Sequence, residues 1–229
     1  MFRVCCAFIT LILILVNSNT CLALSFEEVN QRIIDCNSVM QKAIEMPDRA
    51  IPRDLLKGCR GLAIFPNVMK LGALLGVGFG SGIVLRRDEQ TGQWSKPVFF
   101  SIRSGSFGPQ FGAQSTDLIL VVMSERGVQG LLEESFTLGA DVSVAAGPIG
   151  RDASAETNLR FDSSILSYSR AKGLFAGISL TGASVKPDRE ANEAYHGTGV
   201  TAQDVFYEGK GALSDNARLL METLDNATR

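Results

Sequence analysis

The side chains that could carry out acid–base or nucleophilic chemistry are few in this chain and do not stand in catalytic patterns. The only imidazole belongs to His196, in the polar segment 192–199, and no partner for it lies nearby in the sequence. Serines occur beside glycines, but none lies in the G-x-S-x-G turn that exposes a nucleophile. The carboxylates at expected strand and helix ends are Asp117, Glu133, Glu134, Asp141 and Asp152. Because nothing pairs two of them as acid and base, the sequence predicts a protein without catalytic residues.

Two cysteines, Cys36 and Cys59, lie beyond the first 23 residues and carry the next possible chemistry. An oxidising compartment could join them as a disulfide, whereas in helical segments each could equally be a small buried apolar residue. Both alternatives stay open. Two thiols without a second pair or a nearby histidine do not complete a tetrahedral site, so no metal and no other cofactor is expected.

Glycine alternates with other residues from Gly76 to Gly82, within the run 71–85 (LGALLGVGFGSGIVL). Neither G-x-G-x-x-G nor G-K-[ST] is present, which argues against a nucleotide-binding loop. The alternation predicts a β-strand with one face bare of side chains, so that a neighbouring helix or strand can approach closely. The alternative is a membrane helix that packs through small residues.

Positive charge is sparse overall but gathers after the first expected helix. The chain holds 22 Lys and Arg against 24 Asp and Glu, for a net charge of −2, which argues against a nucleic-acid surface. Arg53, Lys57 and Arg60 recur on one side of a short helix, and Lys70 follows in a turn-like stretch. Beside an amphipathic helix, such residues are suited to contact anionic lipid headgroups. An ordinary solvated helix face is the alternative, since Asp54 dilutes the charge.

The first 23 residues have the pattern of a secretory signal peptide. Arg3 supplies a positive start, residues 7–16 form an apolar core, and the small residues Cys21 and Ala23 precede the expected cleavage site. An uncleaved anchor is less favoured, because the apolar run is shorter than the roughly 20 residues of a membrane span. A lipoprotein acylated at Cys21 is also less favoured, because the preceding residues do not fit that signal. We therefore expect an exported, periplasmic protein that begins near Leu24.

An amphipathic helix is expected next. Ser25 and Glu28 form a capping-box pattern, and Pro47 ends the helix. Its apolar residues recur with a period near 3.6, which leaves one apolar stripe. The side chains predicted to insert into a bilayer are Phe26, Val29, Ile33, Met40 and Ile44. The competing interpretation is that this stripe is buried in the domain's own core. A second short helix is expected over 51–58, where Pro52 is tolerated in the first turn.

From Gly61 onward, short apolar runs are broken by Gly and Pro, which is typical of β-strands. Strand-like segments cover 62–65, 71–85, 96–103, 117–123, 140–146 and 170–185. We expect a hairpin turn at 86–93, a short helix after Ser124, and a C-terminal helix over 204–224 that Gly209 and Gly211 interrupt. The predicted fold class is α+β, with a single Gly-rich β-sheet or barrel-like core flanked by N-terminal and C-terminal helices.

The order of these segments resembles the SYLF-domain family of lipid-binding proteins. The matching stretches are 51–66, the Gly-rich run, 101–114, 117–122, 139–151 and 168–180. The resemblance implies a non-enzymatic domain that binds phospholipids (phosphoinositides in eukaryotic members) with an N-terminal amphipathic helix at the bilayer. The chain departs from the family in carrying Tyr195-His196 at an aromatic pair and in lacking a strongly basic N-terminal arm. Actin binding belongs to eukaryotic relatives with further modules and is not expected for an exported protein.

Together these features predict a signal peptide (1–23) followed by one lipid-binding domain (24–229). Its parts are a helical segment (24–60), a Gly-rich β core (61–200) and a C-terminal helix (201–229). The expected function is peripheral binding of anionic phospholipid at a membrane, with headgroup contact by Arg53, Lys57, Arg60 and Lys70. The alternative is a structural envelope protein that self-associates through its Gly-rich segment.

Overall fold

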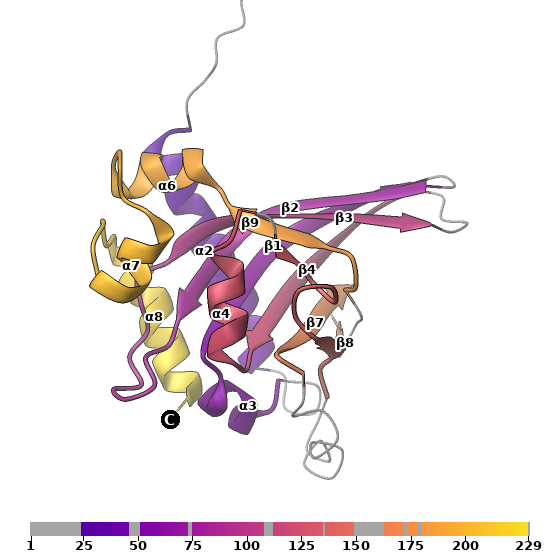
Figure 1. Cartoon of the computed structure of the whole chain (residues 1–229), viewed down its shortest axis with the longest axis horizontal. Coiled ribbons are helices and arrows are strands. Elements are labelled where there is room, and N and C mark those ends of the chain that lie inside the picture. The colour runs from indigo at the N-terminus through magenta and orange to yellow at the C-terminus, as the bar shows by residue number, and fades with distance from the viewer. Residues whose placement is uncertain are drawn as a thin grey trace, which may run out of the picture.

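A computed structural model of the chain is shown in Figure 1. It describes residues 24–45, 51–72, 75–107, 112–134, 136–148, 163–171, 174–177 and 180–228. The predicted signal peptide lies outside the described residues.

The first helix, α2 (Phe26–Ile44), begins where its sequence signals place it. The Ser25 hydroxyl accepts a hydrogen bond from the Glu28 backbone N–H at 3.3 Å, and the Glu28 carboxylate accepts one from the Ser25 N–H at 2.9 Å. This confirms the capping box, which satisfies backbone donors that the first helical turn leaves unpaired. The other described helices are α3 (Arg53–Gly58), α4 (Glu125–Leu131), α6 (Arg189–His196), α7 (Ala202–Glu208) and α8 (Asp215–Thr228).

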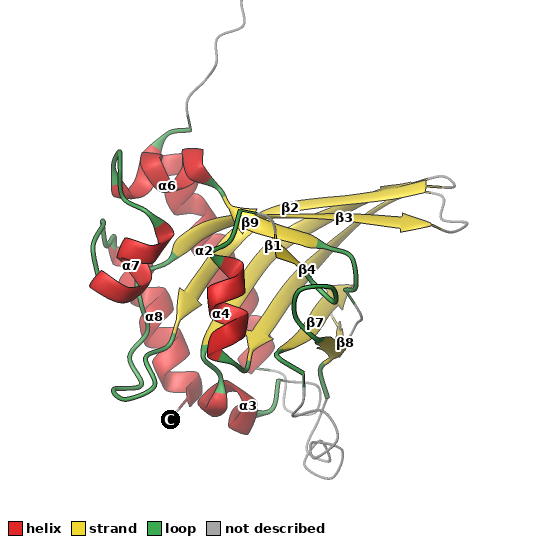
Figure 2. Ribbon diagram, viewed as in Figure 1, coloured by secondary structure: helices red, strands yellow, loops and turns green. Residues whose placement is uncertain are grey.

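In the described residues, nine strands form one sheet, which curls into a half-barrel beside the helices (Figure 2). The strands are β1 (Gly61–Gly72), β2 (Leu75–Arg86), β3 (Val98–Phe107), β4 (Gly112–Val122), β5 (Phe136–Thr137), β6 (Val144–Ala146), β7 (Ile165–Ala171), β8 (Leu174–Gly177) and β9 (Ser184–Pro187). Their order is β5-β9-β3-β2-β1-β4-β7-β6, with β8 paired to β7. The predicted α+β class, with one sheet flanked by N-terminal and C-terminal helices, is confirmed.

Side chains alternate between two apolar clusters, one on each face of the sheet. We call the face under α2, α3, α6 and α8 the outer face; Leu62 and Ile64 of β1 point to it. The inner face lies under α4 and α7 and receives Ala63 and Phe65. The far ends of β1–β4 extend beyond the helices, at the right of Figure 2. This projecting part of the sheet is therefore less covered than the rest.

The alternating glycines of β2 lie on its inner face and let backbone and side-chain atoms of β1 and β3 approach the strand closely. A Cβ added at Gly82 would lie 2.1 Å from the Ile64 carbonyl oxygen, and one added at Gly78 would lie 2.3 Å from the Ser104 hydroxyl. The strand prediction for this segment is thus confirmed, and the membrane-helix and nucleotide-loop interpretations are wrong.

A β-bulge interrupts β1. Its register shifts by one residue against both neighbours, between Phe65 and Val68 on the β4 side. Asn67 has φ 51°, a left-handed conformation that asparagine tolerates better than most residues. The Asp117 carboxylate accepts a hydrogen bond from the Asn67 backbone N–H at 3.1 Å and pairs with Arg170 at 2.9 Å. These contacts hold the bulge in place.

The structure differs from the sequence interpretation in several segments. The expected strand-like segment 170–185 spans the end of β7, all of β8 and the start of β9. The run 71–85, expected as one strand, contains the connection between β1 and β2. Helix α6 was not expected, because most of its residues are polar and its buried face is short. That face includes Ala191 and Tyr195. The C-terminal helix, by contrast, is interrupted as predicted. It is divided into α7 and α8, and Gly209 ends α7 with φ 64°.

Candidate lipid-binding surfaces

The apolar stripe of α2 faces the protein's own core. Val29, Ile33 and Met40 are fully buried in the outer cluster, so in this fold they are closed to a bilayer and their predicted insertion does not fit. The physical reason is that the sheet offers the stripe an apolar surface, and burying each such side chain there is worth about 1.5–3 kcal/mol.

The two ends of the stripe differ from its centre. Ile44 is half-buried against the core, whereas Phe26 is 41% exposed and stacks on Tyr195 with ring centroids 5.1 Å apart. With a rise of about 1.5 Å per residue, these ends lie roughly 27 Å apart. The five predicted insertion residues therefore do not form one exposed surface.

The predicted headgroup cations are also divided between surfaces. Arg53 and Lys57 are exposed on α3, and Arg60 follows it in an ion pair with Glu89. Lys70 lies near the far end of β1, on the inner face, away from α3. Three of the four predicted cations are thus near one another, and Lys70 is not.

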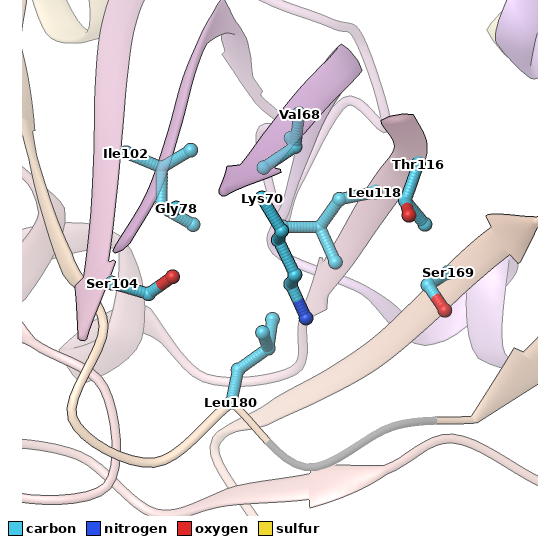
Figure 3. A pocket seen from close by; sticks show the side chains of 9 residues that line it. All are labelled: Val68, Lys70, Gly78, Ile102, Ser104, Thr116, Leu118, Ser169 and Leu180. Carbon is cyan, nitrogen blue, oxygen red and sulfur yellow. The ribbon is translucent and has the colours of Figure 1, made fainter. Parts of the chain in front are cut away.

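Lys70 lines a small inner-face cavity, together with Val68, Ile102, Ser104 and Leu180 among others (Figure 3). Figure 3 shows its side chain crossing the cavity towards Leu180. The enclosed space is about 20 Å³, enough for a water molecule but too small for an acyl chain. This cavity is therefore not a lipid pocket in the conformation described.

An apolar surface that the sequence interpretation missed lies on the outer face of the projecting sheet. We call Met69, Leu71, Val77 and Phe79 the outer sheet patch. Met69 pairs with Phe79, and Leu71 pairs with Val77, across β1 and β2. Leu71, Val77 and Phe79 are 39%, 58% and 47% exposed. Large apolar side chains gathered on an exposed face mark interaction sites more often than isolated ones do.

Cations and hydroxyl groups border this patch. Arg103 of β3 lies directly opposite Phe79 and is exposed. Arg103, Ser81 and Ser101 line a groove of about 360 Å³ beside the patch, and the same three residues line a wider, open groove of about 930 Å³ that includes Lys186 of β9. The outer sheet patch therefore continues into a polar, partly cationic surface.

The signal for this surface was present in the sequence but incomplete. The alternation of glycine over 76–82 also places Val77 and Phe79 together on the opposite face of the strand. What the alternation does not reveal is where helix cover ends. The exposure of the outer sheet patch depends on where the helices stop covering the sheet.

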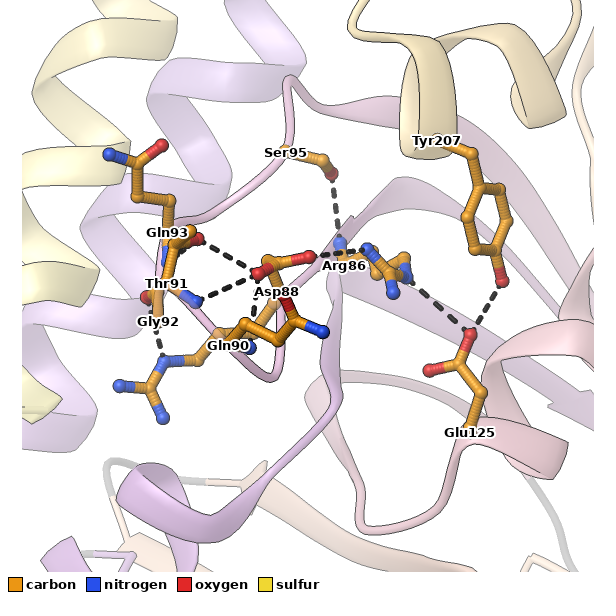
Figure 4. A network of polar contacts seen from close by, with 10 residues as sticks. Arg86, Asp88, Gln90, Thr91, Gly92, Gln93, Ser95, Glu125 and Tyr207 are labelled. Atoms are coloured by element: carbon orange, nitrogen blue, oxygen red, sulfur yellow. Dashed lines mark hydrogen bonds and ion pairs between the residues drawn. The ribbon is translucent and has the colours of Figure 1, made fainter.

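A polar network around Arg86 joins three parts of the fold (Figure 4). The Arg86 guanidinium lies 3.5 Å from the Glu125 carboxylate of α4 and 4.5 Å from the centre of the Tyr207 ring of α7. The Arg86 backbone N–H donates to the Ser95 hydroxyl at 2.9 Å. Burial and a hydrogen bond donated to Glu125 raise the pKa of Tyr207 to about 12. These contacts tie β2 to α4 and α7, although the buried Arg86 Nε makes no hydrogen bond, and we interpret the network as structural.

The remaining titratable groups give no reactive constellation in the described part of the chain. Burial raises the pKa of the Cys36 thiol well above its usual value and that of Cys59 to about 12, and both cysteines are free. His196, expected in a loop, ends α6 with its ring largely buried and Nε2 2.9 Å from the Pro97 carbonyl oxygen. Within the described ranges, no three His, Cys, Asp or Glu side chains are grouped to hold a metal.

The helices of the described residues are short or amphipathic. None combines the length and apolar character needed to cross a bilayer.

Comparison with known proteins adds to this geometry. The family model described as "Ysc84: Las17-binding protein actin regulator" matches residues 103–227. SH3 domain-containing YSC84-like protein 1 of Bos taurus is 34% identical over 183 residues, which are 80% of this chain and 53% of the bovine protein. Protein YSC84 of Saccharomyces cerevisiae is 37% identical over 162 residues, 69% of this chain and 34% of the yeast protein. The chain thus spans about half of the bovine relative and a third of the yeast one.

Proposed function

Since the chain belongs to the Ysc84, or SYLF-domain, family, we propose that it binds anionic phospholipid peripherally at a membrane and catalyses no reaction. The observation that carries the proposal is the outer sheet patch with Arg103 beside it. Apolar side chains can enter the interfacial region of a bilayer, while a cation at their border contacts lipid phosphates. The proposal thus keeps the lipid ligand expected from the sequence and moves the binding surface from α2 to the sheet.

Flotation of the purified protein with liposomes tests the proposal. The full chain is expressed, its N-terminus is read by mass spectrometry, and it is floated with neutral or anionic vesicles at low and high salt. We expect binding to anionic vesicles that weakens with salt, because the Debye length falls from about 10 Å at 0.1 M to about 3 Å at 1 M.

A double substitution assigns the binding to the patch. Val77→Thr with Phe79→Thr removes apolar area but keeps residues suited to a strand. We expect at least tenfold weaker partitioning, since losing about 1.4 kcal/mol of insertion energy has that effect. Leu219→Thr on α8 is the matched control, because Leu219 is 50% exposed and far from the patch in sequence. Equal binding by the double variant and the control would remove the patch from the proposal, provided that both unfold like the parent.

Self-association is the rival use of the same surface and corresponds to the structural envelope alternative. Light scattering without detergent separates the two. A monomer that binds vesicles supports the lipid proposal. An oligomer that the Val77→Thr, Phe79→Thr variant dissociates, with no vesicle binding by the parent, supports self-association.

We further propose export, on the signal-peptide pattern of residues 1–23. Cleavage near Leu24 is the expected mass-spectrometric result. Actin, which the family description names, is not part of the proposal, because an exported protein does not meet the actin of its own cell. Co-sedimentation with actin filaments would argue against this restriction.

A further inference from the structure

The outer face of β2, β3 and β9 brings together residues that are far apart in the sequence. The register pairs Ser81 with Ser101 and Ser101 with Lys186, so these three lie in one row across the strands. Arg103 is the next residue of β3 on the same face and pairs with Phe79 of the outer sheet patch. Diagonal neighbours on adjacent strands are about 7–8 Å apart, so the long side chains of Arg103 and Lys186 can converge on one small group.

The polar groups of these four residues are available to a ligand. In the described part of the chain, the side chains of Ser81, Ser101, Arg103 and Lys186 have no hydrogen-bond or ion-pair partner. Arg103 and Lys186 are exposed, and the two serines are half-buried.

Most of the acidic side chains in the same groove are already engaged. Asp188 pairs with Arg32 at 2.9 Å, and Glu134 pairs with Arg189. The remaining carboxylate of the groove, Glu193, comes from α6 and not from the sheet rows. The sheet rows themselves thus present two cations and two hydroxyl groups without a competing carboxylate.

This combination suits a phosphate group carried as a monoester. Such a group bears about −1.5 to −2 charge at neutral pH and has three strong acceptor oxygens. A guanidinium donates two parallel hydrogen bonds to it, an ammonium adds a second charge, and serine hydroxyls donate to the remaining oxygen. A phosphodiester has fewer free oxygens and a single charge, so it would use the same residues less fully.

We propose that Ser81, Ser101, Arg103 and Lys186 form a subsite for the phosphomonoester headgroup of a lipid whose chains contact the outer sheet patch. The inference rests on the proposed lipid-binding function and deepens it. The groove beside Phe79 that Ser81, Ser101 and Arg103 line makes the headgroup and acyl-chain regions continuous. A lipid bound there would lie with its headgroup towards β9 and its chains towards the ends of β1 and β2.

The test compares two variants that lose the same charge. Arg103→Gln with Lys186→Gln removes the subsite cations, and Arg53→Gln with Lys57→Gln removes two exposed cations from α3. Each is floated with phosphatidylcholine vesicles that contain phosphatidic acid, a phosphomonoester, or phosphatidylglycerol, a phosphodiester. We expect the first variant to lose at least tenfold in binding to phosphatidic acid vesicles, and the α3 variant to lose less than threefold.

Separate outcomes decide the subsite and the proposed function. If the parent floats but both variants lose equally, or neither loses, the subsite is wrong while lipid binding stands. If the parent does not float with either vesicle, the lipid-binding proposal fails and the headgroup subsite fails with it. A titration of the parent with inorganic phosphate, followed by the Arg103 side-chain N–H signals in NMR, then shows whether the four residues bind free phosphate instead.

Discussion

Adding one methyl group to β2 at Gly82 should destabilise the fold strongly. A Cβ there would lie 2.1 Å from the Ile64 carbonyl oxygen and 2.8 Å from the Phe65 Cα, whereas carbon atoms in contact prefer about 3.5–4.0 Å. Both obstructing atoms belong to the backbone of β1, which is hydrogen-bonded on both sides, so neither can move by rotating a side chain. Overpacking costs about 1–3 kcal/mol, and this rigid case should lie at or above the upper end.

The matched substitution is Gly105→Ala in β3, because a Cβ at Gly105 meets nothing within 4 Å. We expect Gly82→Ala to lower the free energy of unfolding by at least about 3 kcal/mol, or Tm by roughly 6–12 °C for a chain of this size. Gly105→Ala should stay within about 0.5 kcal/mol of the parent.

Urea titration followed by the fluorescence of Trp94, the chain's single tryptophan, measures the difference. Trp94 is 5% exposed in the native state and becomes solvated on unfolding. Equal midpoints for Gly82→Ala and the parent, at unchanged m-value, would refute the steric argument. A large loss for Gly105→Ala would show that glycine is needed in these strands for a reason other than close approach.

Two further predictions concern the core and its one imidazole. Ile33→Asp should abolish the cooperative unfolding transition, because Ile33 is fully buried. Ile34→Asp should retain the transition, because Ile34 is 41% exposed. Circular dichroism on heating measures both variants, and equal unfolding behaviour would contradict the burial of the apolar stripe of α2. Burial lowers the pKa of His196 and outweighs the hydrogen bond to Pro97, which raises it. The unfolded chain therefore binds a proton at this histidine more readily than the folded chain does. The free energy of unfolding should consequently fall as the pH drops below about 6.5. In urea titrations between pH 7 and 5, His196→Gln should weaken the dependence of the free energy of unfolding on pH. An unchanged dependence would show that His196 is not its cause.

Much of the fold follows from local signals in the sequence. The capping box at Ser25 sets the start of α2, the glycine alternation sets β2 as a strand, and Gly209 ends α7. These features act within a few residues and have direct chemical causes. Helix α6 escaped prediction because its burial depends on contacts with Phe99 of β3, which lies almost a hundred residues away.

The candidate site was harder to predict. An amphipathic pattern indicates that one face of a helix or strand is apolar, but it does not indicate what covers that face. The apolar stripe of α2 that includes Ile33 fits a helix that lies on a bilayer as well as a helix that packs on a core. In this fold it packs on the sheet. Arg103 and Lys186 come onto one surface only through the pairing of β3 with β9. Such pairing is a long-range property that charge spacing along the chain does not record.

The extra residue at the bulge of β1 also decides which side chains meet solvent on which side. Before the bulge, even-numbered residues such as Ile64 point outward; after it, odd-numbered residues such as Met69 and Leu71 do so. If β1 kept all its residues but lost the bulge, an unbroken alternation would exchange the two sets, placing Lys70 outside and Leu71 inside. The chemical character of both faces of the projecting sheet therefore depends on the bulge as much as on the composition of β1. Deletion of Asn67 would instead remove the bulge and leave Met69 and Leu71 outside, because their pairing with Phe79 and Val77 would stay the same.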